Sequence, residues 1–241
     1  MRGGAVLPGG GTGDSGQERN VNAVTSKRPR DCEDSHGHSK AGHVQSSFWM
    51  HDPELVFAAL GLKQGDVLLD LGCGPGDYAI EAAKVVGDSG TVHGLDRSEE
   101  AIERLTKQAK SQGLGNIKPV VSDITRPLPI DYACIDMCLM ATVLHVPDVV
   151  RSEDGLLEEI RRVLKPCGRV AIIECKKEDM PIGPPLSIRL SPQEVEALMT
   201  PHGFERTSEV DLGYNYMVQF KVARGSSGRI EYRRSRPTTT D

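Results

Sequence analysis

The sequence lacks several features that define other classes of protein. No apolar run approaches the roughly 20 residues that a membrane-spanning helix needs. Positive charge is not in excess, because 29 lysine and arginine residues stand against 34 aspartate and glutamate residues and the net charge is −5. Arg2 is followed by no apolar segment of the kind that a secretory signal requires. We therefore expect a soluble cytoplasmic protein without a membrane or nucleic-acid partner.

Paired cysteine motifs are also missing. The six cysteines form no Cys-x-x-Cys pair, and most of them lie in apolar or strand-like segments. Such a distribution is typical of buried, reduced thiols in a cytosolic protein. The cysteines are Cys32, Cys73, Cys134, Cys138, Cys167 and Cys175.

The length of 241 residues predicts one domain, here residues 45–224, between two tails. Residues 1–44 hold many Gly, Ser and charged residues and almost no periodic apolar ones, so we predict a disordered tail. Residues 225–241 carry a short basic run and are predicted to be a flexible tail. The histidines of the first tail have no cysteine partners at finger spacing, so we favour a solvated tail over a metal site.

Between the tails, strand-like runs alternate with segments of helical periodicity. Strands are predicted near 67–71, 91–96, 117–121, 133–140, 170–174 and 214–222, the fifth of them after a turn at 166–168. Helices are predicted from the Asp52 cap to Gly61, at 79–86, from Ser98 to Gly113, at 153–164, and after the capping box Ser191–Glu194. This alternation predicts an α/β protein with a doubly wound, mostly parallel sheet and an antiparallel hairpin at one edge.

Residues 66–76, Asp-Val-Leu-Leu-Asp-Leu-Gly-Cys-Gly-Pro-Gly, are the most informative stretch. A buried strand runs into Gly72, Gly74 and Gly76, which predict a tight turn that lets a ligand approach the backbone and the N-terminus of the next helix. A carboxylate at Asp70 repels a pyrophosphate and attracts a cationic or ammonium-bearing ligand.

This arrangement resembles motif I of the class I S-adenosylmethionine-dependent methyltransferases. The likeness is greatest to the small-molecule group that includes the ubiquinone/menaquinone C-methyltransferases (type 11), and it covers roughly residues 46–222. It implies a Rossmann-like fold with seven strands in the order 3-2-1-4-5-7-6. It also implies S-adenosylmethionine as the cofactor.

Acids at three strand ends are placed to bind that cofactor. Asp96 ends the second strand, where a carboxylate can accept two hydrogen bonds from a ribose diol, and Asp123 with Ile124 follows the third. The resemblance implies that this last pair contacts the adenine. NAD is the competing cofactor, but its Gly-x-Gly-x-x-Gly fingerprint is not matched because Asp77 follows Gly76. The full predicted cofactor set is Asp70, Gly72, Gly74, Gly76, Asp96, Arg97, Asp123, Ile124 and Met140.

His145, just past the fourth strand, is the candidate catalytic residue. It would act as a base or contact the substrate, although a structural histidine is the alternative. Asp136, inside the fourth strand, fits either a satisfied buried acid or a site residue near the methionine end. Phe48, Trp49 and His51 precede the first helix and fit a lid over the cofactor or an anchor for that helix. Lys176 and the loop after it fit either an anionic substrate or a solvated charge pair.

The predicted function is methyl transfer from S-adenosylmethionine to a small-molecule acceptor by in-line displacement. A non-catalytic module that binds the cofactor or a protein is one alternative. A thiol-assisted arsenite-type methyltransferase that uses Cys73, Cys138 and Cys175 is another. The acceptor and the oligomeric state stay open.

Overall fold

The structure is a computed structural model, and it describes residues 46–223. The predicted tails at 1–44 and 225–241 lie outside the described residues. The strands are β1 (Val67–Leu71), β2 (Thr91–Asp96), β3 (Ile117–Val121), β4 (Ile135–Ala141), β5 (Leu164–Cys175), β6 (Phe204–Asp211) and β7 (Asn215–Val222). The helices are α1 (Pro53–Leu60), α2 (Asp77–Val86), α3 (Glu99–Ser111), α4 (Pro147–Val150), α5 (Glu153–Val163) and α6 (Pro192–Met199). Short 3₁₀ turns are η1 (Ser47–Met50), η2 (Leu186–Ile188) and η3 (Thr200–His202).

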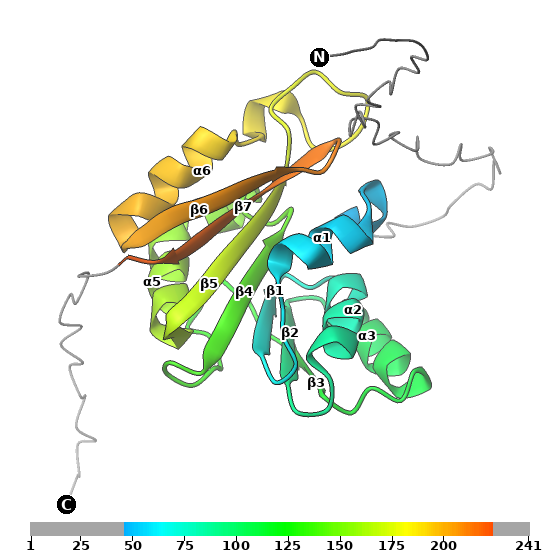
Figure 1. Cartoon of the computed structure of the whole chain (residues 1–241). Coiled ribbons are helices and arrows are strands. Elements are labelled where there is room, and N and C mark those ends of the chain that lie inside the picture. Colours follow the sequence, from blue (N-terminus) through cyan, green and yellow to red (C-terminus); the bar gives the residue numbers. More distant parts are fainter. Residues whose placement is uncertain (1–45, 224–241) are drawn as a thin grey trace, which may run out of the picture. The chain divides into compact units, whose positions relative to one another are not determined.

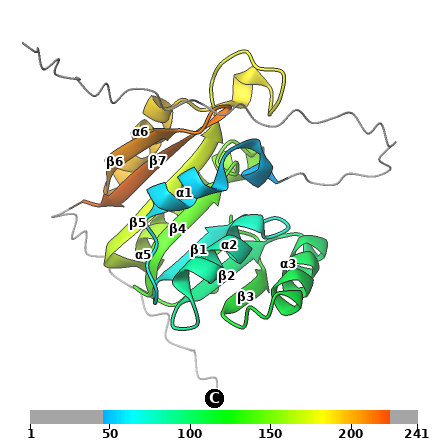
Figure 2. The same cartoon turned by 45° about the vertical axis from the view of Figure 1, so that its right-hand side comes forward.

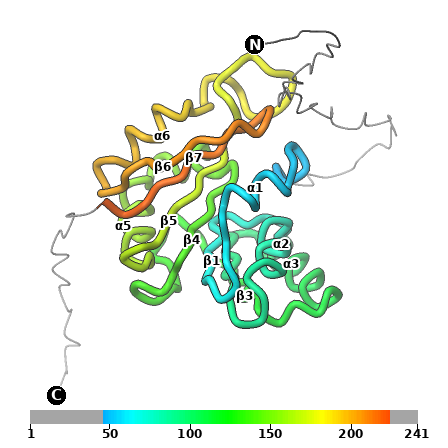
Figure 3. Tube along the Cα trace, in the orientation of Figure 1, coloured from blue at the N-terminus to red at the C-terminus, as the bar shows by residue number. Residues whose placement is uncertain are grey.

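The strands form one seven-stranded sheet in the order β3-β2-β1-β4-β5-β7-β6, which confirms the order that the resemblance implied. The first five strands of this row are parallel, and β7 pairs antiparallel with both β5 and β6 (Figure 2). The chain reaches β3 at one edge and then returns to β4 beside β1, as the trace in Figure 3 shows. In such sheets ligands bind where the strand order reverses, at the carboxyl ends of the strands.

Three helices, α1, α3 and α6, begin at the caps that the sequence predicts, whereas α2 begins at Asp77 rather than 79, α3 ends at Ser111 before Gly113, and α4 was not predicted. The Asp52 carboxylate accepts the N–H of Glu54 at the start of α1, and Gly61 ends that helix in the left-handed region. Ser98 caps α3, and the Ser191 capping box with Glu194 opens α6.

Helices cover both faces of the sheet. Figure 1 shows α1, α2 and α3 on one side and α5 and α6 on the other. Each side has its own hydrophobic core, with Val56, Ala79 and Leu105 in the first and Leu156, Ile160 and Val195 in the second. The central strands are buried between the two cores, so their carboxyl ends are the accessible part for a ligand.

Three details differ from the sequence prediction. β4 begins at Ile135 rather than near 133, because Ala133 has a φ of 51° and cannot continue a strand. β5 begins at Leu164, so the predicted turn at 166–168 is an irregular start of the strand, with a register shift against β4. β7 is buried on both faces over most of its length, because it lies between β5 and β6. The alternating pattern of burial appears instead on β6, the edge strand.

Candidate functional site

A cavity of about 310 Å³ lies at the carboxyl ends of β1, β2 and β4. We call it the β1–β4 cleft. Its walls come from the turn after β1, the end of β2, the loop after β3, and the segment from Ala141 to Val149. Six of the predicted cofactor residues line it, namely Gly72, Gly74, Asp96, Arg97, Asp123 and Ile124.

The glycines of the β1–α2 turn have different tasks. Gly74 has a φ of 53°, and a Cβ there would meet no atom within 4 Å, so this part of the backbone is open to a ligand. Gly76 has a φ of 92°, and a Cβ there would lie 2.4 Å from Cδ1 of Leu105. Gly76 does not line the cleft. Glycine is therefore required at position 76 for packing, and at 74 for access.

Asp70 lies beneath this turn with 1% exposure and does not line the cleft. Its Oδ2 atom is buried without a hydrogen-bond partner within the described residues. Burial, and after it the neighbouring charge of Asp96, raises the pKa of Asp70 to about 8. The free protein therefore holds this group largely protonated at neutral pH, and a cation nearby would favour its ionised form.

Asp96 fixes the other side of the turn. Its Oδ2 accepts the N–H of Gly74 at 2.9 Å, and its Oδ1 accepts the N–H of Ser98 at 2.8 Å. A carboxylate offers about four lone-pair sites, so each oxygen can still accept a hydroxyl. Asp96 thus supports the turn and can bind a diol at the same time.

Asp123 is an exposed turn residue on the cleft wall. Its Oδ1 accepts the backbone N–H of Thr125 at 2.9 Å and the Thr125 hydroxyl at 2.7 Å. The backbone bond, then the hydroxyl bond, lower the pKa of Asp123. Ile124 beside it is buried but contributes to the apolar lining.

Arg97 reaches across the mouth of the cleft. Its Nη1 lies 3.1 Å from Oδ2 of Asp148, and both residues line the cleft. Asp148 also pairs with Arg151 just after the same short helix. Both side chains of the Arg97–Asp148 pair are largely exposed, so the pair adds little stability. The pair connects the end of β2, where Arg97 lies, with α4, where Asp148 lies.

Met140 and His145 do not line the β1–β4 cleft. Met140 is fully buried in β4. The Nδ1 atom of His145 lies 2.7 Å from Oε2 of Glu174, near the carboxyl end of β5. The neighbouring side chains Val143 and Val146 do line the cleft.

Asp136 is a satisfied structural acid, which decides between the two interpretations of the sequence. It lies at the amino end of β4, away from the cleft. Its Oδ2 accepts the N–H of Val67 at 2.9 Å and pairs with Nζ of Lys165 at 2.7 Å.

Thr142 is a site residue that the sequence analysis missed. It lines the cleft at the end of β4 with a φ of 56°, which is rare for a β-branched residue. Its N–H donates to the carbonyl of Ile173 at 2.7 Å and so fixes this conformation. No sequence signal marks such strain, because it comes from the neighbouring strand.

A second group, of which the sequence analysis named only His51, joins the N-terminal segment to α2. The Tyr78 hydroxyl lies 2.8 Å from Nε2 of His51 and 3.2 Å from the Ser47 hydroxyl. Burial lowers the pKa of His51 to about 4, so its ring is neutral at physiological pH. Ser47 and Tyr78 also line the cleft. These contacts join residues about 30 positions apart in the sequence, which is why the pattern alone gives no sign of them.

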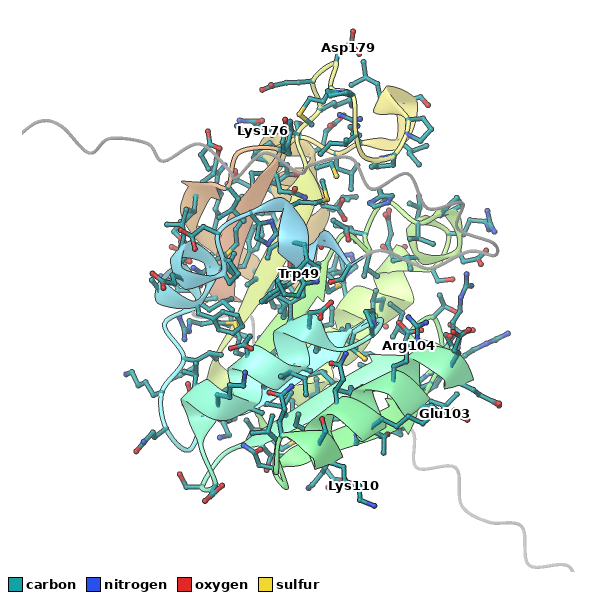
Figure 4. All side chains as sticks on the ribbon, turned by 90° about the vertical axis from the view of Figure 1, so that its right-hand side faces the viewer. Trp49, Glu103, Arg104, Lys110, Lys176 and Asp179 are labelled. Carbon is teal, nitrogen blue, oxygen red and sulfur yellow. The ribbon has the colours of Figure 1, made fainter. Side chains whose placement is uncertain are left out.

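Phe48 and Trp49 behave differently. Phe48 is buried against the ring of Tyr78 with 5.1 Å between centroids, so it anchors the segment. Trp49 is 70% exposed and touches Phe48 edge-on. Figure 4 shows Trp49 between the loop that holds Lys176 and Asp179 and helix α3, which holds Arg104.

The loop after β5 is held by Arg189. Its buried guanidinium donates to the carbonyls of Pro184, Lys176, Glu178 and Ile182. Lys176 and Lys177 pair with Asp211 and Glu194 at the surface. These lysines form charge pairs, in line with the second interpretation of the sequence.

The three cysteines of the arsenite-type alternative form no metal-binding group. Cys138 is fully buried in the core, and burial raises the pKa of the Cys73 thiol and of the Cys175 thiol. Within residues 46–223, no three His, Cys, Asp or Glu side chains are grouped so as to hold a metal ion. The geometry therefore gives this alternative no support.

The sheet order, the cleft at the strand reversal and the acids at neighbouring strand ends define an α/β protein that binds a nucleoside-containing cofactor. Comparison with known proteins gives the family. Residues 62–210 match the family described as "Methyltransferase domain". The chain belongs to this family.

Three relatives illustrate the likeness. A demethylmenaquinone methyltransferase from Lactobacillus johnsonii is 38% identical over 127 residues, which are 52% of this chain and 50% of that protein. A 2-phytyl-1,4-naphtoquinone methyltransferase from Trichormus variabilis is 30% identical over 196 residues, 73% of this chain and 83% of that protein. The crystal structure of a SAM-dependent methyltransferase from Aquifex aeolicus has 30% identity and a TM-score of 0.66, covering 73% of this chain and 93% of that one. The match to the first relative spans only about half of its length.

The cofactor of this family is S-adenosylmethionine, and the residues present fit it. The unpartnered Oδ2 of Asp70 is a buried acceptor near which an ammonium group is favourable. The open space at Gly74 admits the backbone of an amino acid, and Asp96 keeps acceptor capacity for ribose hydroxyls. Among residues 46–223, no helix is both long and apolar enough to cross a membrane.

Proposed function

We propose that this protein transfers a methyl group from S-adenosylmethionine to a small-molecule acceptor by in-line displacement. The observation that carries the proposal is the pair of acids at neighbouring strand ends. Asp70 lies unpartnered under an open glycine turn, and Asp96 lies on the cleft wall. The part of a dinucleotide that lies against such a glycine turn is the anionic pyrophosphate, whereas the cofactor of this family carries an ammonium and a sulfonium.

The residues act by binding, orienting and excluding water. In the proposal Asp70 favours the amino-acid end, Asp96 accepts the ribose hydroxyls, and Asp123 with Ile124 holds the adenine. Val143, Val146 and Val149 give the cleft an apolar wall that limits water at the reacting atoms. When bound, the cofactor supplies an electrophilic methyl carbon whose bond to sulfur breaks with the electron pair returning to sulfur. Alignment of two bound reactants can contribute roughly 7–11 kcal/mol in favourable cases.

The acceptor in this proposal is a small organic molecule. Relatives of this chain are named for demethylmenaquinone and a phytyl naphthoquinone, which supports a quinone-derived ring as the first class to test. The net charge of −5 supports the absence of a nucleic-acid partner. We also propose a cytoplasmic location, because the free cysteines Cys73, Cys138 and Cys175 suit a reducing compartment.

The test is formation of S-adenosylhomocysteine by the full chain with a panel of hydroquinones, phenols, thiols and amines. We expect turnover with at least one class and a loss of about 100-fold or more in kcat/KM for Asp96→Ala, since two charge-assisted hydrogen bonds disappear. Asp88→Ala is the matched control, because Asp88 is exposed in the loop before β2, at the other end of that strand. Tight cofactor binding without turnover on any class would favour the non-catalytic module instead.

A further inference from the structure

Glu174 is a buried carboxylate that none of the predicted roles uses. It is the penultimate residue of β5 and is 1% exposed. Its Oε1 accepts the backbone N–H of Leu144 at 2.9 Å, and its Oε2 lies 2.7 Å from Nδ1 of His145. Among the ion pairs of residues 46–223, Glu174 has no lysine or arginine partner. A buried carboxylate of this kind is stabilised mainly by the donors that reach it.

The contact determines which nitrogen of His145 is available. An ionised carboxylate can only accept hydrogen bonds, so the Nδ1 atom of His145 carries the proton. In the neutral ring the Nε2 atom then has a free lone pair, and it makes no hydrogen bond within the described residues. This is the arrangement of a histidine that accepts a proton through Nε2 while a carboxylate fixes its tautomer and orientation.

The backbone that carries His145 is itself fastened to β5. The N–H of Thr142 donates to the carbonyl of Ile173, and the N–H of Leu144 donates to Glu174. Two adjacent residues of β5 thus fix the turn after β4 on either side of Val143, which lines the cleft. The His145 side chain is 13% exposed, and Val143 and Val146 on either side of it along the chain line the cleft.

We propose that Glu174 positions His145 as the base for an acceptor that must lose a proton from a hydroxyl group, a phenol or a hydroquinone. This inference rests on the methyl-transfer function proposed above. An aromatic amine has a free lone pair at neutral pH without losing a proton, and a thiol ionises close to neutral pH. A phenolic hydroxyl has an ordinary pKa of about 10 and therefore gains most from an adjacent imidazole.

The proton step conserves atoms and charge. The O–H bond of the acceptor breaks, its electron pair stays on oxygen, and the proton bonds to the lone pair of Nε2. The positive ring that results is balanced by the Glu174 carboxylate. The electron pair on oxygen forms the new bond to the methyl carbon as the carbon–sulfur bond breaks with its electron pair on sulfur. Where a conjugated ring carbon forms the bond instead, that carbon then loses its C–H proton to water and the oxygen regains a proton, which restores the aromatic ring. The imidazolium later releases its proton to water.

The first arm of the test observes the tautomer directly. ¹⁵N NMR of the histidine-labelled full chain, with His145 identified by the loss of its signals in His145→Gln, should show the proton on Nδ1. In Glu174→Gln the amide carbonyl can still accept the Leu144 N–H, while the amide NH₂ donates to Nδ1 and moves the ring proton to Nε2. A proton on Nε2 in the wild type, or no change in Glu174→Gln, overturns the proposal.

The second arm compares two acceptors in the same variants. With 1,4-naphthohydroquinone under reducing conditions, Glu174→Gln and His145→Gln should lose about 100-fold or more in kcat, the usual contribution of a general base. With thiophenol, which is largely ionised at pH 8 and needs no base, the loss should stay within about threefold. Equal losses on both acceptors would mean a structural role and overturn the proposal.

Two controls separate this inference from the proposed function. Glu158→Gln makes the same change on the exposed side of α5 and should match the wild type in both arms. Binding of S-adenosylmethionine by calorimetry should be unchanged in Glu174→Gln, because Glu174 does not line the cleft. Failure of the wild type to bind this cofactor would contradict the proposed function, and the tautomer measurement would then decide the role of Glu174 by itself.

Discussion

At the scale of single residues, the buried carboxyl group of Asp70 makes the stability of the cofactor-free protein depend on pH. This group is buried next to Asp96, and its pKa is raised from 3.8 to about 8, first by burial and then by that neighbour. Between these two values the folded protein binds one more proton than the unfolded chain. The free energy of unfolding therefore falls as the pH rises from about 4 to 8, by at most about 1.4 kcal/mol per pH unit.

We predict that Asp70→Asn removes this dependence. Between pH 6 and pH 8 the wild type should lose on the order of 2 kcal/mol more stability than the variant, because only the wild type must ionise a buried carboxyl group in that window. Urea unfolding of the cofactor-free protein at the two pH values measures the difference. Asp88→Asn, an exposed acid, should keep the wild-type slope. A variant slope equal to that of the wild type would show that Asp70 does not titrate there.

Site residues could be predicted from the sequence where their position depends only on a nearby strand or turn. Gly72, Gly74, Asp96 and Ile124 stand at fixed offsets from one strand or turn, and each lies on the cleft wall. Glu174 and Thr142 could not be found this way, because their contacts join β4 and β5, about 30 residues apart in the chain. The roles of the individual site residues stay predictions until a variant is measured.

At the scale of elements, the turn between β1 and α2 needs glycine at position 74 both for its left-handed backbone and for the open space beside it. Gly74 has a left-handed φ of 53° and open space beside it. Gly113, after α3, has a φ of 69°, and a Cβ there would likewise meet no atom within 4 Å, but this glycine does not line the cleft. A substitution at either glycine therefore causes the same kind of backbone strain, but only Gly74 lies on the wall of the cleft.

We predict that Gly74→Ala and Gly113→Ala each destabilise the protein by about 1 kcal/mol, the cost of a left-handed L-residue. Only Gly74→Ala should also weaken binding of S-adenosylmethionine, by tenfold or more (about 1.4 kcal/mol), because its methyl group occupies the open part of the turn. Urea unfolding and calorimetry measure the two effects. Equal affinities in the two variants would show that the turn does not approach the cofactor.

Helix starts could be predicted more reliably than strand burial. Asp52, Ser98 and Ser191 cap helices by hydrogen bonds to residues two or three positions away, so the signal lies in the sequence itself. The burial of β7 depends on β6, which pairs with it, and on β5 on the other side. An alternating pattern at 214–222 does not show that both faces are covered.

At the scale of the whole molecule, the parallel sheet brings together acids from distant parts of the sequence. Asp70 lies next to the last residue of β1, Asp96 ends β2 and Asp123 follows β3, so the three acids lie near the same edge of the sheet. The alternation of strands and helices predicts this edge, whereas the strand order came from the resemblance to class I methyltransferases. The matched family region, residues 62–210, contains all three acids and the His145–Glu174 pair.

Calorimetric titration of the full chain with S-adenosylmethionine at pH 7 tests the central claim most directly, that this cofactor binds to Asp96 on the wall of the β1–β4 cleft and favours the ionised form of the buried Asp70. We predict binding by the wild type and by Asp88→Ala, an affinity about 100-fold lower in Asp96→Ala, and release of close to one proton that is absent in Asp70→Asn. No binding by the wild type, or equal affinity in Asp96→Ala, would contradict the account.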